Sequence, residues 1–410
     1  MEDSWRVQLK PDCFKEFENT GERFLLEISE LEGTGTKVAG VYCLLAPVEV
    51  IRAAGAIPVS LCGKKEKPIA DAERILPASL CPLIKSSYGY AITDTCPYFS
   101  ASDFLIAETT CDGKKKMYEL LGRVKPLHLM HLPYSVNEPH ALHFWHQEIL
   151  RLGSFVEELT GRKIDVEHLR YQIIIHNRIR ELARKISRYQ AAERVPISGL
   201  DMMTVMETKS FCVYPEKYLD LLRKFVSEMD DIARSGFSPF EPGAPRILLT
   251  GCPIGKGSEK VLRLIEECGG AVVCMENCTG VKGLDLLVDE KESDPFLALA
   301  RRYLQIPCSC MTPNDGRLDL LDRLINEYRV DGIVDLTLQY CHTYNIESRV
   351  IGEFVENGRG LPFLHLETDY SDSDVEQLRT RIEAFLEMTR WRSSVCTEAG
   401  QPRTAAKFYN

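Results

Sequence analysis

The sequence predicts an α/β protein with two parallel-sheet domains in tandem and a helical segment between them. Short apolar runs bounded by turn residues alternate with stretches of helical periodicity, which is typical of parallel sheets built from β-α-β units. The two halves of the chain repeat this order in outline, and the region that separates them has helical spacing alone. A length of 410 residues also exceeds what one compact core usually contains.

The first α/β domain is expected at residues 36–136, after an N-terminal helical segment at 1–35. Its first strand, VAGVYCLL, is followed by a helix, Gly55 and a second strand that ends in cysteine. Two further apolar runs follow, and the first of them continues into the helical sequence CDGKKKMYELLG. The four expected strands span 38–45, 56–62, 103–111 and 125–133.

The helical segment is expected at residues 137–235, where apolar residues recur at helical spacing opposite charged faces. The second α/β domain is expected at 236–395 and repeats the order of the first. Its four expected strands span 245–252, 271–278, 330–341 and 361–368. The last residues, 396–410, are expected to form a flexible tail.

The composition narrows the classes of function. Lys and Arg number 50 against 60 Asp and Glu, and the formal net charge of −10 offers no basic surface for nucleic acid or anionic lipid. No apolar run approaches the ~18 residues that a membrane-spanning helix needs. The first residues are charged and lack the apolar centre of a secretory signal. We therefore expect a cytoplasmic protein that binds neither nucleic acid nor membrane.

Cysteine is the unusual feature of the composition. The chain contains 15, an odd number, and a reducing cytoplasm disfavours disulfides. Some are expected to be small apolar residues that pack inside helices or strands. These are Cys13, Cys43, Cys212, Cys268 and Cys396. Most of the others stand close to Pro, Gly, Asn, Asp or Thr near the ends of apolar runs, and thiolates gathered at loop ends are typical of a metal centre.

Six of these cysteines are expected to meet in one cleft. Cys111 and Cys341 end corresponding strands in the two halves, and each precedes a helix whose N-terminal amides favour an adjacent thiolate. Ligands of open parallel sheets bind beyond the carboxyl ends of the strands, so two facing sheets would bring such thiolates together. The candidate ligands are Cys81, Cys111, Cys278, Cys308, Cys310 and Cys341.

Two other interpretations of the cysteines stay open at this point. Structural zinc sites favour close cysteine pairs, but Cys274-x3-Cys278 and Cys308-x-Cys310 belong to no recognisable ribbon or finger. Packing alone accounts for buried cysteines in strands, but poorly for cysteines in polar loops. The spacing favours an iron–sulfur centre over either alternative.

A glycine-rich loop with the sequence GCPIGKGS spans residues 251–258. It is one residue short of the phosphate-binding pattern and has Gly257 where Ser or Thr is required. No ATP site is therefore expected on this chain.

Five motifs carry a resemblance to a known family. They are LCPLIKSSYG, ETTCDGKKKMYE, PCSCMTPNDGR, LQYCHTYNIE and ETDYSDSDVEQLRTRIEAFLE. They resemble the 2-hydroxyacyl-CoA dehydratase and benzoyl-CoA reductase family, and within it most of all the double-cubane cluster proteins. Ordinary dehydratase subunits of this family hold one 4Fe-4S cluster with three cysteines. By motif, these positions fall here on Cys81, Cys111 and Cys341.

In the double-cubane branch, six thiolates hold two 4Fe-4S units that share a sulfide, giving an 8Fe-9S cluster. The resemblance implies Cys278, Cys308 and Cys310 as ligands of the second unit, with Cys96 or Cys62 as substitutes. It also implies a homodimer whose cluster lies between two Rossmann-like (flavodoxin-like) domains.

The function implied by the resemblance is the reduction of a small unsaturated substrate, such as acetylene, by low-potential electrons. A separate ATP-hydrolysing iron–sulfur activator would supply the electrons, which agrees with the failed phosphate-loop pattern. Two alternatives stay open. One is a lyase, a 2-hydroxyacyl-CoA dehydratase component with a single 4Fe-4S cluster, and the other is a non-catalytic electron-transfer protein.

Overall fold

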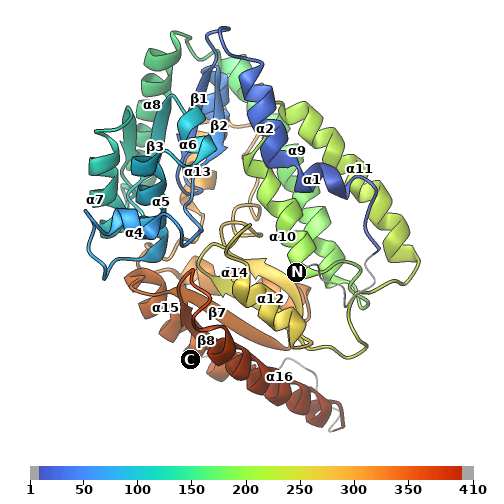
Figure 1. Cartoon of the computed structure of the whole chain (residues 1–410). Helices are drawn as coiled ribbons and strands as arrows, with labels where there is room; N and C mark the ends of the chain where they lie inside the picture. The colour runs from blue at the N-terminus through green and yellow to red at the C-terminus, as the bar shows by residue number, and fades with distance from the viewer. Residues whose placement is uncertain (1–8, 399–410) are drawn as a thin grey trace.

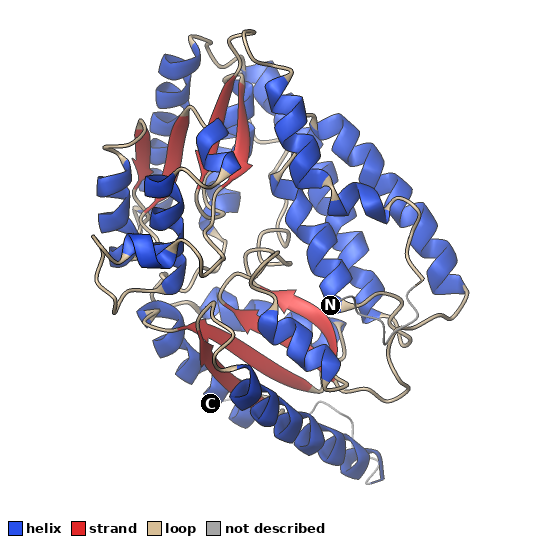
Figure 2. Cartoon of the chain, in the orientation of Figure 1, coloured by secondary structure: helices blue, strands red, loops and turns tan. Residues whose placement is uncertain are grey.

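The computed structural model describes residues 9–398. It confirms two tandem α/β domains, each built around a four-stranded sheet (Figures 1 and 2). All eight expected strands are present, and every pairing between them is parallel. The two sheets share one topology, in which the first strand of each domain lies between the second and the third.

The first sheet has the strand order β2-β1-β3-β4. Its strands are β1 Lys37–Val41, β2 Ala56–Ser60, β3 Phe104–Glu108 and β4 Leu127–Met130. Five helices follow or connect them: α3 Val48–Ala53, α4 Ile69–Ala72, α5 Pro82–Thr93, α6 Pro97–Ala101 and α7 Asp112–Leu121. Every residue of β3 is buried, as expected for a parallel strand with both faces covered.

The second sheet has the order β6-β5-β7-β8. Its strands are β5 Arg246–Gly251, β6 Ala271–Glu276, β7 Gly332–Leu338 and β8 Phe363–Thr368. The helices of this half are α12 Lys260–Glu267, α13 Pro295–Leu304, α14 Asp315–Glu327, α15 His342–Glu353, η3 Phe354–Gly358 and α16 Val375–Glu398. All seven residues of β7 are buried, so this sheet too is covered on both faces.

Helices from two other parts of the chain lie beside the sheets (Figure 1). The N-terminal helices are α1 Phe14–Glu18 and α2 Thr20–Ser29. The region between the domains forms α8 Ala141–Thr160, α9 Val166–Ser187, η1 Arg188–Ala191, α10 Gly199–Glu207, η2 Thr208–Ser210 and α11 Pro215–Arg234.

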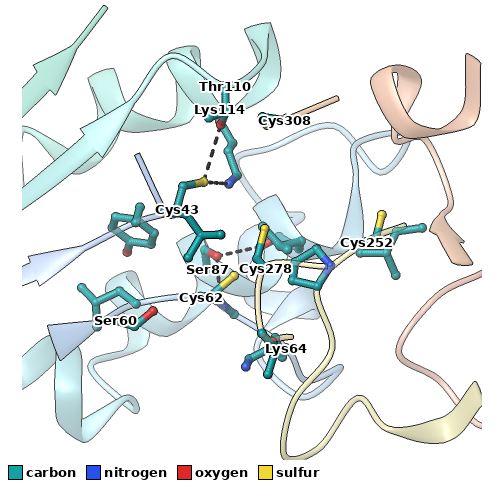
Figure 3. A pocket seen from close by; sticks show the side chains of 18 of the residues that line it. Cys43, Ser60, Cys62, Lys64, Ser87, Thr110, Lys114, Cys252, Cys278 and Cys308 are labelled. Carbon is teal, nitrogen blue, oxygen red and sulfur yellow. Dashed lines mark hydrogen bonds between the residues drawn. The ribbon is translucent and has the colours of Figure 1, made fainter. Parts of the chain in front are cut away.

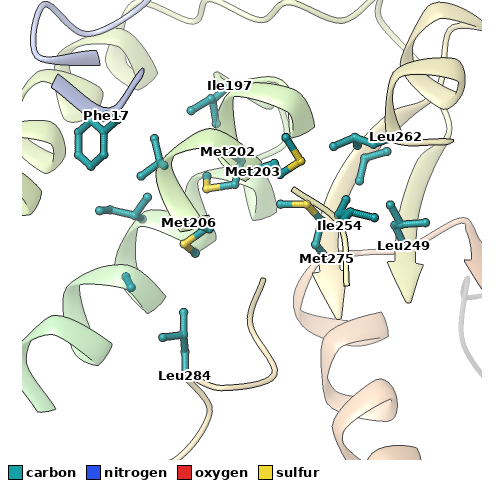
Figure 4. Packing of buried hydrophobic residues seen from close by; sticks show 14 of the residues in the cluster. Phe17, Ile197, Met202, Met203, Met206, Leu249, Ile254, Leu262, Met275 and Leu284 are labelled. Carbon is teal, nitrogen blue, oxygen red and sulfur yellow. The ribbon is translucent and has the colours of Figure 1, made fainter. Parts of the chain in front are cut away.

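These helices pack against both sheets. On α8, Trp145 and Leu152 are fully buried in the core of the first domain. On α10, Met202 and Met203 pack in one cluster with Met275 of β6 (Figure 4). Helix α13 also crosses between the halves, because it follows β6 in the chain but packs against α8. The two sheets are therefore held in place by shared helices.

The strands end earlier than the apolar runs predicted. The first expected strand continued through Cys43, whereas β1 ends at Val41 and Cys43 has φ of 70°. The strand expected at 330–341 ends at Leu338, and Tyr340 has φ of 60°. A left-handed backbone leaves the strand ladder. The cysteines expected at strand ends therefore lie in the loops that follow.

Two further points concern the chain as a whole. The predicted flexible tail, 396–410, lies outside the described residues except for its first three, which continue α16. Within residues 9–398, no helix combines the length and apolar character needed to cross a membrane.

Candidate functional site

A cavity of about 1890 Å³ opens at the carboxyl ends of both sheets (Figure 3). Its walls are the loops after β1, β2 and β3 of the first domain and after β5, β6 and β7 of the second. This is the position at which open parallel sheets bind ligands. The two sheets therefore contribute to one site.

The lining of this cavity is rich in thiols. Ten of the 14 cysteines that the structure describes line it. They are Cys43, Cys62, Cys81, Cys96, Cys111, Cys252, Cys278, Cys308, Cys310 and Cys341. All six candidates from the sequence are among them, and so are the two substitutes, Cys62 and Cys96.

Cys43 corrects one expectation, because it lines the cavity rather than packing inside a strand. The Lys114 ammonium group donates a hydrogen bond to Cys43 Sγ at 2.6 Å, and Thr110 Oγ1 lies 3.6 Å from the same sulfur. Cys43 has φ of 70°, which takes the chain out of β1 at the point where Cys43 and Leu44 line the cavity. Of the other cysteines expected to pack, Cys13 and Cys212 are buried in the hydrophobic core.

Two more expected packing cysteines fall elsewhere. Cys268 is partly buried against the core outside the cavity. Cys396 lies beyond the residues whose side chains the structure describes.

Cys252 is a cavity residue that the sequence reasoning did not single out. It follows β5 directly and is 2% exposed. The sequence does contain an indication that Cys252 belongs to the site. The apolar run PRILLTGC ends in this cysteine, just as the apolar run before Cys341 ends in that one.

Helix N-termini position four of the cavity thiols. Cys81, Cys96, Cys111 and Cys341 are the N-cap residues of α5, α6, α7 and α15. The Lys114 backbone N–H donates a hydrogen bond to Cys111 Sγ at 3.4 Å. Unpaired amides and the helix dipole stabilise a thiolate or an anionic group at this position.

One group of thiols forms around Cys341. Hydrogen bonds from the thiols of Cys252 and Cys81 hold the pKa of the Cys341 thiol well below its usual value. The pKa of Cys81 is raised by its interaction with Cys341 and by burial. Burial raises the pKa of Cys252, and the contact with Cys341 adds to this effect. The thiols of Cys81, Cys252 and Cys341, which come from both domains, therefore interact with one another.

A second group forms around Cys308. The Cys310 thiol donates a hydrogen bond to Cys308 and lowers its pKa to about 6, and Lys282 and Lys114 act in the same direction against burial. The pKa of Cys310 is raised in turn by this contact and by burial. Burial also raises the pKa of Cys111.

Buried cations stand beside the thiols. Lys282 is 2% exposed, forms an ion pair with Glu276 at 3.2 Å and donates to the Tyr344 hydroxyl at 3.3 Å. Lys209 donates to the carbonyl oxygens of Met206 and Thr279, and burial lowers its pKa to about 8. Lys209 lines the cavity and Lys282 lies behind its wall, and positive groups so close to the thiols stabilise an anionic occupant.

The donor set indicates which metal centre would suit the cavity. Among residues 9–398, no three His, Cys, Asp or Glu side chains converge on the position of a single ion. The ligands of an iron–sulfur cubane bind different irons and therefore stand farther apart than the ligands of one ion. A large cavity lined by thiols at strand ends and helix N-termini fits such a cluster.

The glycine-rich loop at 251–258 presents its amides to carboxylates. The Lys256 N–H donates to Glu207 Oε2 at 2.9 Å, and the Gly257 N–H donates to Glu259 Oε2 at 2.5 Å. Amides already bound to carboxylate oxygens are not arranged as a phosphate cradle.

Comparison with known proteins matches nearly the whole chain. The family model described as 2-hydroxyglutaryl-CoA dehydratase, D-component, matches residues 43–389. A protein of Escherichia coli (strain K12) named as a dehydratase subunit, YjiM, is 44% identical over 92% of this chain and 98% of its own length. The (R)-phenyllactyl-CoA dehydratase beta subunit of Clostridium sporogenes is 23% identical over 91% of this chain and 97% of its own length. One benzoyl-CoA reductase subunit of Thauera aromatica is 26% identical over 43% of this chain and 42% of its own length.

Proposed function

Because this chain belongs to the 2-hydroxyglutaryl-CoA dehydratase D-component family, we propose that it is the iron–sulfur component of an ATP-dependent reductase system. In this proposal, the cavity holds an 8Fe-9S double-cubane cluster. The cluster passes low-potential electrons to a small unsaturated substrate.

One observation carries the proposal. Ten cysteines line a single cavity between the two sheets, whereas a 4Fe-4S cluster uses only about four protein ligands. The six thiols suggested by the sequence all line this cavity and form the starting set of ligands. They are Cys81, Cys111, Cys341, Cys278, Cys308 and Cys310.

The cluster would supply one-electron chemistry, and the residues of the chain would set its environment. Cys111 and Cys341 place their sulfur atoms at helix N-termini, where amides stabilise negative charge. Lys114 and Lys282 bring positive charge close to the thiols. Burial and hydrogen bonds to sulfur are the means by which a protein sets the potential of such a centre.

Electrons would come from a separate ATP-hydrolysing iron–sulfur activator. The amides of the glycine-rich loop donate to Glu207 and Glu259, so ATP hydrolysis is assigned to the partner. The component is further proposed to be a cytoplasmic homodimer.

A second function is favoured by the relatives. Two of them that this chain matches over nearly its full length are named as dehydratase subunits. This candidate is a 2-hydroxyacyl-CoA dehydratase component with one 4Fe-4S cluster, held by Cys81, Cys111 and Cys341. A third candidate is an electron carrier without catalysis of its own.

Parallel assays distinguish the three candidates. Anaerobically purified protein is supplied with ATP, a strong reductant and an ATP-dependent iron–sulfur reductase, and then with acetylene or a 2-hydroxyacyl-CoA thioester. Reduction of acetylene is expected, and Cys341→Ser should abolish it while Cys268→Ser, outside the cavity, should not. Dehydration without reduction would favour the second candidate. A redox-active cluster that turns over neither substrate would favour the third.

A further inference from the structure

Two buried glutamates end strands beside the cavity. Glu108 is the last residue of β3 and Glu276 is the last residue of β6, and both are fully buried. Thr109 and Thr110 follow Glu108 directly and line the cavity, as does Cys278, two residues after Glu276. Both glutamates therefore stand next to the cavity wall without being part of its lining.

Glu276 is surrounded by partners. Its carboxyl group forms ion pairs with Lys282 at 3.2 Å and with Arg317 at 3.4 Å, and both of these cations are buried. The Thr250 hydroxyl donates a third interaction to the same carboxyl group at 2.5 Å. The negative charge of Glu276 is thus matched by two cations inside the fold.

Glu108 has no such partners. The N–H groups of Leu45 and Ala46 donate to its Oε1 atom at 3.1 and 2.7 Å. Its Oε2 atom is buried and has no hydrogen-bond partner, and the carboxyl group forms no ion pair within residues 9–398. A buried carboxylate without a cation is costly, so such a group holds a proton instead.

The pKa of Glu108 agrees with this geometry. Burial is the largest effect and raises the pKa from 4.5 to about 8, against the amides of Ala46 and Leu45 and the charge of Lys114. One pKa unit is a factor of ten, so at pH 7 about ten of these carboxyl groups are protonated for each one that is ionised. An acid with a pKa close to the working pH is well suited to release and recover a proton.

Four titratable groups face Glu108 from the surrounding elements. They are Cys43 after β1, Lys114 and Tyr118 on α7, and Cys308 before α14. Lys114 is bound to the Cys43 sulfur at 2.6 Å and not to Glu108, and both residues line the cavity (Figure 3). Glu108 therefore has a pair of proton-carrying groups between itself and the interior of the cavity.

We propose that Glu108 stores a proton behind the cavity wall and releases it when the bound substrate is reduced, an inference that rests on the proposed function. Reduction of acetylene to ethylene takes two electrons and two protons, and it replaces one carbon–carbon π bond by two C–H bonds. For the first C–H bond, the Glu108 O–H bond breaks and the Lys114–Cys43 pair transfers the proton into the cavity. The second proton comes from solvent, and the electrons are those that the activator supplies.

The surroundings of Glu108 tolerate the carboxylate that this step leaves. The amides of Leu45 and Ala46 remain bound to Oε1, and the Lys114 ammonium group faces the new charge. These are the groups that lower the pKa of Glu108 against the effect of burial. The carboxylate then recovers a proton from solvent before the next turnover.

Infrared spectroscopy tests the protonation of Glu108 without any turnover. A protonated carboxyl group has a C=O stretch that differs from that of a carboxylate and shifts in D₂O. Anaerobically purified wild-type protein should show this band at pH 7 and lose it as the pH rises through about 8. Burial also raises the pKa of Asp335, so the protein is prepared with ¹³C-labelled glutamate, which shifts the Glu108 band alone.

Three variants connect the proton to the reaction. Glu108→Gln keeps the shape of the side chain but has no acidic proton, so it should lose the band, keep its iron and reduce acetylene about 10²-fold more slowly. Glu108→Asp restores an acid and should recover part of the rate. Glu119→Gln is the matched control, because Glu119 forms an exposed ion pair with Lys116, and it should keep both the band and the rate.

The outcomes separate this inference from the proposed function. A labelled wild-type protein without a glutamic acid band at pH 7 overturns the role of Glu108 alone, and this result needs no variant to fold. A Glu108→Gln protein with full iron and the wild-type rate does the same. Wild-type protein that holds the cluster but does not reduce acetylene overturns the proposed function, and the release of the proton to that substrate falls with it.

Discussion

Replacing Arg180 by Met should destabilise the protein by about 3–5 kcal/mol at pH 7, because it leaves a buried carboxylate without its partner. Glu49 on α3 is fully buried, and the Arg180 guanidinium on α9 forms an ion pair with it. The Tyr303 hydroxyl on α13 donates to Glu49 at 2.8 Å, and Arg180 donates to that hydroxyl at 3.0 Å. The Glu49 carboxylate therefore links three helices, α3, α9 and α13, that lie far apart in the sequence.

The pKa of Glu49 predicts how the loss of stability in Arg180→Met changes with pH. Burial is the largest single effect and would raise the pKa of Glu49, but Arg180 together with the smaller effects of His176 and Arg302 lowers it from 4.5 to about 2. A depressed pKa contributes stability above the unfolded-state value, so the wild type loses this contribution as the pH falls from 4.5 toward 2. In Arg180→Met the largest lowering effect is lost and burial, the largest effect on Glu49, raises its pKa. The deficit of the variant should therefore shrink as the pH falls to 4.5 and below.

The assay is urea unfolding followed by tryptophan fluorescence, at pH 7 and at pH 4.5. Lys116→Met is the matched control, because it breaks an exposed ion pair with Glu119 and should leave the unfolding midpoint unchanged. A loss below about 1 kcal/mol for Arg180→Met at pH 7, or a deficit that grows on acidification, would refute the reasoning.

The remaining predictions concern the cluster, the core and the partner. Cys81→Ala, Cys111→Ala and Cys341→Ala should each lose cluster iron and visible absorbance, and a full iron complement in any of them removes that residue from the ligand set. Trp145→Ala should cost about 3–5 kcal/mol in urea unfolding, because the side chain is fully buried in the first core; a change within error would mean that the site collapses around the smaller residue. The purified protein should not hydrolyse ATP, and hydrolysis that tracks its own concentration would contradict the assignment of that activity to the partner.

The eight strands and their parallel pairing could be predicted from the sequence, because apolar runs and helical periods reflect burial directly. The ends of the strands could not. Cys43 stands in a continuous apolar run and was expected to pack, yet a positive φ turns the chain there into the cavity. The residue at which a strand ends depends on its pairing with neighbouring strands. An apolar stretch of sequence taken alone carries no information about that pairing.

Other features depend on tertiary structure in the same way. The pairing of Glu49 with Arg180 joins positions 131 residues apart. The return of α13 to the first domain has no local signal, because its sequence fits any amphipathic helix. The six candidate cysteines did reach one cavity, since strand ends of parallel sheets share an edge. Which thiols meet within the cavity depends on how the two sheets face each other.

The most direct test of the central proposal is the iron and acid-labile sulfide content of anaerobically purified wild-type protein. A double-cubane cluster predicts about eight irons and nine sulfides per chain, with an absorption spectrum that disappears when a chelator removes the metal. About four irons and four sulfides per chain would contradict the account and favour a single-cubane dehydratase component.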